Sequence, residues 1–190
     1  MFGMRRNPVG RPDAELVAWS AAGDRAAFGE LVRRHGSAVR ALLRRMGAEA
    51  ATADDLAQDA FLQAFQKIGG LQDGSLFAAW IKQIAARMYV RRWKKDKRLD
   101  LMAEPPEPEG DERTHHAPVA AKLDLEQAMK ALSPIQQMCV SLCFGADLSH
   151  AEAAEALNVP LGTVKSHVKR GLDKLRAEMG AGQPGSQAHG

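Results

Sequence analysis

The chain has 190 residues, a formal net charge of +3 and a sequence pI near 9.0, so any affinity for a polyanion must come from local patches rather than from total charge. No stretch approaches the run of about 18 apolar residues that a membrane span needs, and the first residues lack the apolar core of a signal peptide. The length predicts one or two domains, and we expect a cytoplasmic protein without membrane insertion.

The first part of the chain predicts an all-helical domain over residues 13–99, preceded by an N-terminal arm of residues 1–12. Asp13 is a candidate N-cap for a short first helix that ends near Gly23, and Asp24 can cap the second helix. The second helix keeps an apolar stripe at helical spacing, with arginines on most of its other face. The stripe consists of Phe28, Leu31, Val32, Val39, Leu42, Leu43 and Met46.

The third predicted helix carries an acidic face. We expect it to begin after Thr52, a candidate N-cap, and to bury Leu56, Ala60, Phe61, Ala64, Phe65 and Ile68. Its exposed side would consist of Asp54, Asp55, Gln58, Asp59 and Leu62, here named the acidic face. Spacing alone is typical of a solvated face, but Leu62 could also anchor a partner while the carboxylates steer basic groups toward it.

The fourth predicted helix, from about Ser75 to Arg98, changes character along its length. Its first half, SLFAAWIKQIA, packs Phe77, Trp80, Ile81 and Ile84, and its second half, RMYVRRWKKDKR, has seven basic residues against one acidic residue. Arg87, Arg91, Lys94, Lys95 and Arg98 share one helical side, which suits a polyanion. Tyr89 and Trp93 could either stack on unpaired bases or close the domain core.

Residues 100–121 are rich in proline and acidic side chains without periodicity, which indicates a flexible linker, and His115 and His116 are expected to be solvated there. A second domain is predicted over residues 122–179, followed by a disordered polar tail of residues 180–190. Cys139 and Cys143 lie on one apolar helical stripe and are expected in the core. A metal or redox pair with His150 is the alternative, but no second cysteine pair completes a zinc set, so no cofactor or metal is expected.

A helix-turn-helix is predicted in the stretch from Ser149 to Arg176. Ser149 and Glu152 form a capping box, and the helix is expected to stop near Asn158 because Pro160 follows. A second helix after Gly162 and Thr163 has an apolar side, formed by Val164, Val168, Leu172 and Leu175. The residues placed to meet DNA are Thr163, Lys165, Ser166, His167, Lys169 and Arg170. In a helix-turn-helix, this second helix lies in the major groove, whereas a basic amphipathic helix alone would be an ordinary solvated element.

The order of these motifs resembles a known family. The acidic TADDLAQDAFLQAFQKI helix, the FAAWIKQIAARMYVRRWKK helix that turns basic, the acidic linker and LSHAEAAEALNVPLGTVKSHVKR are together similar to bacterial sigma-70-family RNA polymerase sigma factors. The match is closest to the extracytoplasmic-function (ECF, group IV) type and covers about residues 13–178. It implies an all-α fold with a four-helix sigma region 2 domain and a region 4 helix-turn-helix domain, joined by the linker.

The resemblance also implies partners and roles. The acidic face would bind the beta-prime clamp helices of core RNA polymerase, with the beta flap as a further contact, and an anti-sigma factor would hold the protein inactive between its two domains. The downstream (−10) promoter box would meet Gly74, Ser75, Arg87, Tyr89, Arg91, Arg92, Trp93, Lys94 and Lys95. The helix-turn-helix residues would read the upstream (−35) box of a stress or envelope type of regulon. Met88 stands where the family often has Asn, and His167 where Arg is common, which puts the promoter sequence in question.

Two other function classes fit the sequence less well. A stand-alone helix-turn-helix regulator would leave the acidic third helix and the basic fourth helix without roles. An enzyme is not expected, because the sequence has no Gly-rich phosphate loop, G-x-S-x-G or H-E-x-x-H motif.

Overall fold

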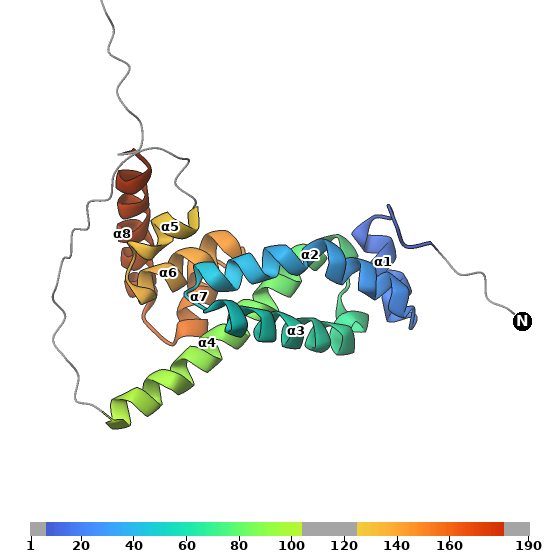
Figure 1. Ribbon diagram of the computed structural model, residues 1–190, viewed down its shortest axis with the longest axis horizontal. Helices are drawn as coiled ribbons and strands as arrows, with labels where there is room; N and C mark the ends of the chain where they lie inside the picture. Colours follow the sequence, from blue (N-terminus) through green and yellow to red (C-terminus); the bar gives the residue numbers. More distant parts are fainter. Residues whose placement is uncertain (1–6, 104–124, 181–190) are drawn as a thin grey trace, which may run out of the picture.

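The computed structural model describes residues 7–103 and 125–180, which form two groups of α-helices (Figure 1). The first group contains α1 (Asp13–Ala21), α2 (Arg25–Arg45), α3 (Ala50–Lys67) and α4 (Phe77–Ala103), with the 3₁₀ turns η1 (Ile68–Gly70) and η2 (Gly74–Leu76) between α3 and α4. The second contains α5 (Leu125–Lys130), α6 (Pro134–Val140), the π-helical turn η3 (Ser141–Gly145), α7 (His150–Leu157) and α8 (Leu161–Gly180). No strand occurs in these ranges, and the predicted all-α, two-domain class is confirmed. Most of the predicted linker and tail, and residues 1–6 of the arm, lie outside the described residues.

The first domain is built on α2, which packs against α1, α3 and α4. Asp24 caps it as predicted, since Oδ1 accepts hydrogen bonds from the amides of Ala26 (2.9 Å) and Ala27 (3.2 Å). Of the predicted stripe, Leu31, Val39, Leu42, Leu43 and Met46 are buried, and Phe28 is half-buried with its ring 4.9 Å from that of Phe65. Phe65 itself is 36% exposed and not buried as predicted.

Two predicted caps in this domain are wrong. Helix α3 begins at Ala50, so Thr52 lies inside its first turn, and its N-cap Glu49 makes no side-chain cap bond. Helix α1 begins at Asp13, with Pro12 as N-cap, and the Asp13 carboxylate pairs with α2 instead of capping its own helix. At Asp13, the ion pairs with α2 occupy the carboxylate oxygens that a cap would use.

Helix α4 continues to Ala103, five residues beyond its expected end at Arg98. The residues after Arg98, which read LDLMA up to Ala103, are all compatible with a helix, and the first proline comes only at position 105. The basic side of α4 is therefore part of one continuous helix of 27 residues whose C-terminal end projects away from the other helices (Figure 1).

The second domain packs α6 against α8. A capping box that was not predicted starts α6: the Ser133 amide donates to Gln136 Oε1 (3.1 Å), and the Gln136 amide donates to Ser133 Oγ (3.4 Å).

Cys139 is fully buried and Cys143 is half-buried, as expected for a core stripe. Burial raises the pKa of Cys139 to about 11, and it also raises the pKa of Cys143. Among the described residues, no group of His, Cys, Asp and Glu is arranged to hold a metal ion.

The two domains share one buried apolar cluster, in which Leu42 and Val90 of the first domain join Leu142 and Ala146 of the second. The approach is tight at Gly145 of η3, where a Cβ atom would lie 2.6 Å from Leu42 Cδ1. Glycine is therefore the residue that lets η3 press against α2 at this point. Lys82 Nζ, on α4, lies 4.0 Å from Asp147 Oδ2 at the same boundary.

Candidate polymerase and nucleic-acid interfaces

The acidic face of α3 is solvent-exposed over its whole length. Asp54, Asp55, Gln58, Asp59 and Leu62 are all exposed, and Leu62 keeps 57% of its surface accessible. Asp54 Oδ1 forms an ion pair with Arg40 Nε of α2, at 2.8 Å. An exposed leucine among carboxylates combines an apolar anchor with charges that attract a basic partner.

The basic part of α4 exposes several cations along one helix. Arg87, Arg91, Arg92 and Lys95 are exposed, and Arg92 Nε lies 3.9 Å from Asp96 Oδ2 one turn later. Exposed pairs of this kind contribute little to stability, so these cations remain available to a polyanion. Lys94 is different, because its Nζ donates to the backbone carbonyl of Ala156 at 2.7 Å. Helix α4 thus presents cations to solvent and also holds the second domain.

The two aromatic residues in the basic part of α4, Tyr89 and Trp93, pack against the core. Tyr89 is 8% exposed and belongs to the shared core, and Trp93 is half-buried against the same cluster. Burial raises the pKa of Tyr89. The side chain lies close to the loop after α2, where a Cβ atom on Gly47 would be 3.3 Å from the Tyr89 hydroxyl. In this arrangement the Tyr89 ring serves core packing rather than base stacking, which is the second of the two predicted alternatives.

The connection between α3 and α4 carries the remaining residues predicted for the downstream box. Ser75 is exposed and Gly74 is half-buried. Asp73 Oδ1 accepts hydrogen bonds from the Ser75 amide (2.9 Å) and from Ser75 Oγ (2.6 Å), and these bonds lower the pKa of Asp73. The Asp73 side chain therefore stabilises the turn through hydrogen bonds to Ser75.

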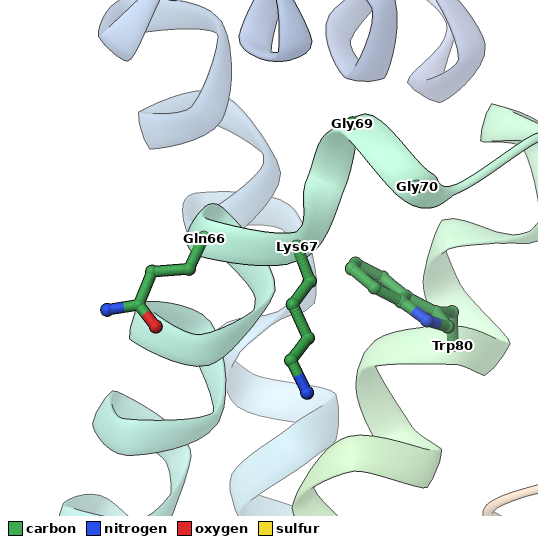
Figure 2. Close-up of a pocket in the computed structure, with 5 residues that line it drawn as sticks. All are labelled: Gln66, Lys67, Gly69, Gly70 and Trp80. Atoms are coloured by element: carbon green, nitrogen blue, oxygen red, sulfur yellow. The ribbon is translucent and has the colours of Figure 1, made fainter.

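A hollow beside this connection was not predicted. Figure 2 shows the Trp80 ring between the Gly69–Gly70 turn and the α4 helix, with the Lys67 side chain next to it and Gln66 farther along α3. Trp80 was predicted as a core residue and is half-buried, so one part of its ring faces the hollow. In the sequence, only the adjacent glycines Gly69 and Gly70 indicate such a hollow. Because they have no side chains, they leave one face of the Trp80 ring uncovered.

The helix-turn-helix has the predicted form. The Ser149 amide donates to Glu152 Oε2 (2.9 Å) and the Glu152 amide donates to Ser149 Oγ (3.2 Å), so the capping box of α7 is confirmed. The bonds from Ser149 lower the pKa of Glu152, with a smaller contribution from Arg87 of α4. Helix α7 ends at Leu157, and its C-cap Asn158 adopts a left-handed φ of 57° that asparagine tolerates. Helix α8 then begins at Leu161, before Gly162 and Thr163 and not after them as predicted.

Helix α8 buries the predicted apolar side and exposes most of the predicted DNA-contacting residues. Val164, Val168 and Leu175 are buried, and Leu172 is half-buried. Lys165, Ser166, Lys169 and Arg170 are exposed, whereas Thr163 and His167 are half-buried. His167 therefore lies at the edge of the exposed side rather than at its centre.

The chain is similar to proteins of one family along most of its length. The models for Sigma-70 region 2 and Sigma-70, region 4 match residues 31–99 and 128–177. The ECF RNA polymerase sigma factor RpoE of Cereibacter sphaeroides is 32% identical over 160 residues, covering 82% of this chain and 88% of that protein. The ECF RNA polymerase sigma factor SigE of Mycolicibacterium smegmatis is 31% identical over 180 residues, covering 89% of this chain and 68% of that protein.

Solved structures share the fold. CnrH, in its complex with the cytosolic domain of CnrY, matches with a TM-score of 0.54 and 24% identity, over 91% of this chain and 100% of that chain. The sigma factor RpoE of Bartonella quintana, in complex with the anti-sigma factor NepR, matches with a TM-score of 0.54 and 23% identity, over 82% of this chain and 98% of that chain.

The chain belongs to the extracytoplasmic-function group of sigma-70-family RNA polymerase sigma factors. Members of this family are transcription initiation factors, which agrees with the expectation of a DNA-binding protein.

No helix in the described ranges is both long enough and apolar enough to cross a lipid bilayer.

Proposed function

We propose that this protein binds core RNA polymerase and directs it to promoters by recognising a downstream and an upstream box. The observation that carries the proposal is the coexistence of three exposed surfaces on one chain. These are the acidic face of α3, the cations of α4 and the exposed side of α8 from Lys165 to Arg170. A protein that only bound duplex DNA would need the last of them alone.

Each surface suits a different partner. The acidic face, with Leu62 as anchor, fits the beta-prime clamp helices of the polymerase, and the second domain would contact the beta flap. The α4 cations fit the phosphates of the downstream box, while α8 fits the major groove of the upstream box. Lys165, Lys169 and Arg170 bring cationic donors to that groove, and Arg170 can also offer two parallel donors to guanine.

The experiment is transcription in a reconstituted system. Purified protein is mixed with sigma-free bacterial core polymerase and a genomic promoter library, and initiated transcripts are sequenced. We expect a complex of the two proteins and transcripts that share two upstream sequence boxes. A stand-alone helix-turn-helix regulator would bind duplex DNA without forming the complex and without starting transcription, so that result would contradict the proposal.

We also propose that an anti-sigma factor regulates the protein and that its target genes form a stress or envelope type of regulon. The two solved structures of similar fold were each determined with a second protein, named as an anti-sigma factor in the case of NepR. Affinity purification from the host, with and without core polymerase as competitor, tests this: a specific partner that polymerase displaces supports it. Recovery of polymerase alone contradicts it.

A further inference from the structure

Helix α1 lies directly against the turn that precedes α4. A Cβ atom on Gly74 would lie 2.9 Å from Ala14 Cα, 3.0 Å from Val17 Cβ and 3.2 Å from the Ala14 carbonyl oxygen. Backbone therefore meets backbone at this point, and only glycine fits. Because no side chain separates the two segments, a displacement of α1 would be transmitted to η2 directly.

The position of α1 is set in turn by a charged network with α2. Asp13 Oδ1 lies 3.1 Å from Arg34 Nη1, and Asp13 Oδ2 lies 2.6 Å from His35 Nε2. Arg34 Nη1 also donates to the carbonyl of Arg11, just before α1. These groups are mostly shielded from solvent, with 23% of the Arg34 side chain and 22% of the Asp13 side chain exposed.

The network is anchored at both ends. Arg34 Nε lies 2.8 Å from Glu30 Oε1, a carboxylate that is only 6% exposed, which orients the guanidinium toward α1. The His35 ring packs against Phe77, the first residue of α4, with ring centroids 5.5 Å apart. His35 of α2 therefore contacts α1 before the turn, through Asp13, and α4 after it, through Phe77.

We infer that Asp13 and Arg34 are positioning residues that set promoter specificity through the Gly74–Leu76 turn. The inference rests on the proposed function and on the expectation, implied by the family resemblance, that Gly74 and Ser75 of this turn meet the downstream box. Neither residue touches the DNA. They hold α1, α1 supports the turn, and the turn determines which base the box must present.

The first test measures the turn itself and does not involve transcription. Amide hydrogen exchange is compared at Ser75 and Leu76, whose N–H groups donate to Asp73 Oδ1 and to the Asp73 carbonyl. Asp13→Ala should speed exchange at both amides by about tenfold, since a lost charge-assisted bond is worth more than a neutral one. Glu15→Ala is the matched control, because Glu15 is also acidic and in the first turn of α1 but meets only Arg11, at 3.8 Å. Unchanged exchange in Asp13→Ala would overturn the inference.

The second test measures base preference. Initiation by the holoenzyme is compared on promoters that carry each of the four bases at every downstream-box position, with the upstream box constant. Asp13→Ala and Arg34→Met should each reduce the preference at one position by about fivefold or more, which is the size of one base contact. Their effects should not add, since both act through one contact. Arg33→Met is the control for Arg34, because Arg33 pairs with Glu30 and not with Asp13.

The outcomes separate the inference from the proposed function. A lower melting temperature with wild-type base preference would show that the network is merely structural, and would overturn the inference while leaving the proposed function intact. Failure of the wild-type holoenzyme to initiate on any promoter would overturn the proposed function and the inference with it. A shifted preference at one position, shared by both variants and absent from both controls, supports the inference.

Discussion

Lys94 of α4 donates from Nζ to the backbone carbonyl of Ala156 in α7, at 2.7 Å. Ala156 lies at the C-terminal end of α7, where free carbonyls and the negative end of the helix dipole attract a cation. A lysine predicted to bind a phosphate thus also binds the helix-turn-helix domain. Its ammonium has three N–H donors, and this bond uses one of them, so Lys94 links the two domains through the same group that is predicted to meet DNA.

We predict that Gly145→Ala separates the two domains in solution. The new Cβ would lie 2.6 Å from Leu42 Cδ1, which is fully buried and has little room to move, and overpacking of this kind costs about 1–3 kcal/mol. Small-angle X-ray scattering should show a larger radius of gyration. Gly162→Ala is the control, because its Cβ would meet nothing within 4 Å, and equal profiles for both variants would contradict the prediction.

Reversing the charges of Asp55 and Asp59 to Lys should weaken the binding of core polymerase by at least tenfold while leaving the helix content unchanged. Both side chains are exposed, and neither takes part in the Arg40–Asp54 pair, so the fold loses no interaction described for them. Fluorescence anisotropy with labelled core enzyme measures the affinity. Glu178→Lys, an exposed reversal on α8, should bind like the wild type, and wild-type affinity in the double variant would identify the acidic face as an ordinary solvated surface.

Replacing Arg170 with Ala should reduce upstream-box recognition by about 1–3 kcal/mol if the guanidinium contacts a base. The residue is exposed on α8 and free to reach the groove. Binding is measured on the preferred site and on random duplexes over a range of salt concentrations. A specific contact lowers affinity for the preferred site only, whereas an equal loss on both, with a shallower salt dependence, would mean that Arg170 contacts phosphate.

The Glu30 cluster predicts a pH-dependent stability. Hydrogen bonds from Arg33 and Arg34 lower the pKa of Glu30 to about 2, from an ordinary value of 4.5. The ionised carboxylate therefore stabilises the folded state fully above pH 4.5, and this stabilisation is lost as the pH falls through about 2. The melting temperature of Glu30→Gln should lie below that of the wild type at pH 7, and the difference should shrink steadily below pH 4.5. A difference that is constant down to pH 2.5 would contradict this assignment.

The native protein should react slowly with thiol reagents at pH 8. Burial raises the pKa of both cysteines, to about 11 for Cys139, and the thiolate is the reactive form. Ellman's reagent should label both cysteines quickly in denaturant. In the folded protein, both should be labelled much more slowly. Rapid labelling of the folded protein would contradict the core position of these side chains.

Local interactions made several elements predictable from sequence. Asp24 and the Ser149–Glu152 pair cap helices with atoms two or three residues away, so their spacing was a sufficient signal. The apolar side of α8 followed in the same way from helical periodicity. The exposure of Lys165 and Arg170 could be predicted for the same reason, since these residues do not belong to the buried stripe.

Contacts between distant segments were not predictable in this way. Asp13 was expected to cap its own helix, but its partners, Arg34 and His35, lie 21 and 22 residues away. Lys94 shares a helical side with exposed cations, and only the position of α7 shows that it is engaged. The sequence left Tyr89 open between stacking and packing because periodicity cannot distinguish a domain's own surface from a surface covered by the second domain.

Because α4 is one unbroken helix, the packing of its buried end in the core sets the direction of its basic end. At about 1.5 Å per residue, its 27 residues span roughly 40 Å. Phe77 and Ile81, both fully buried, hold one end, while the cations lie toward the other. A tilt of about 5° at the buried end would move the far end by roughly 3 Å, comparable to the length of a hydrogen bond. Small changes in the packing of Phe77 would thus displace the cations of α4, which lie far from it along the helix.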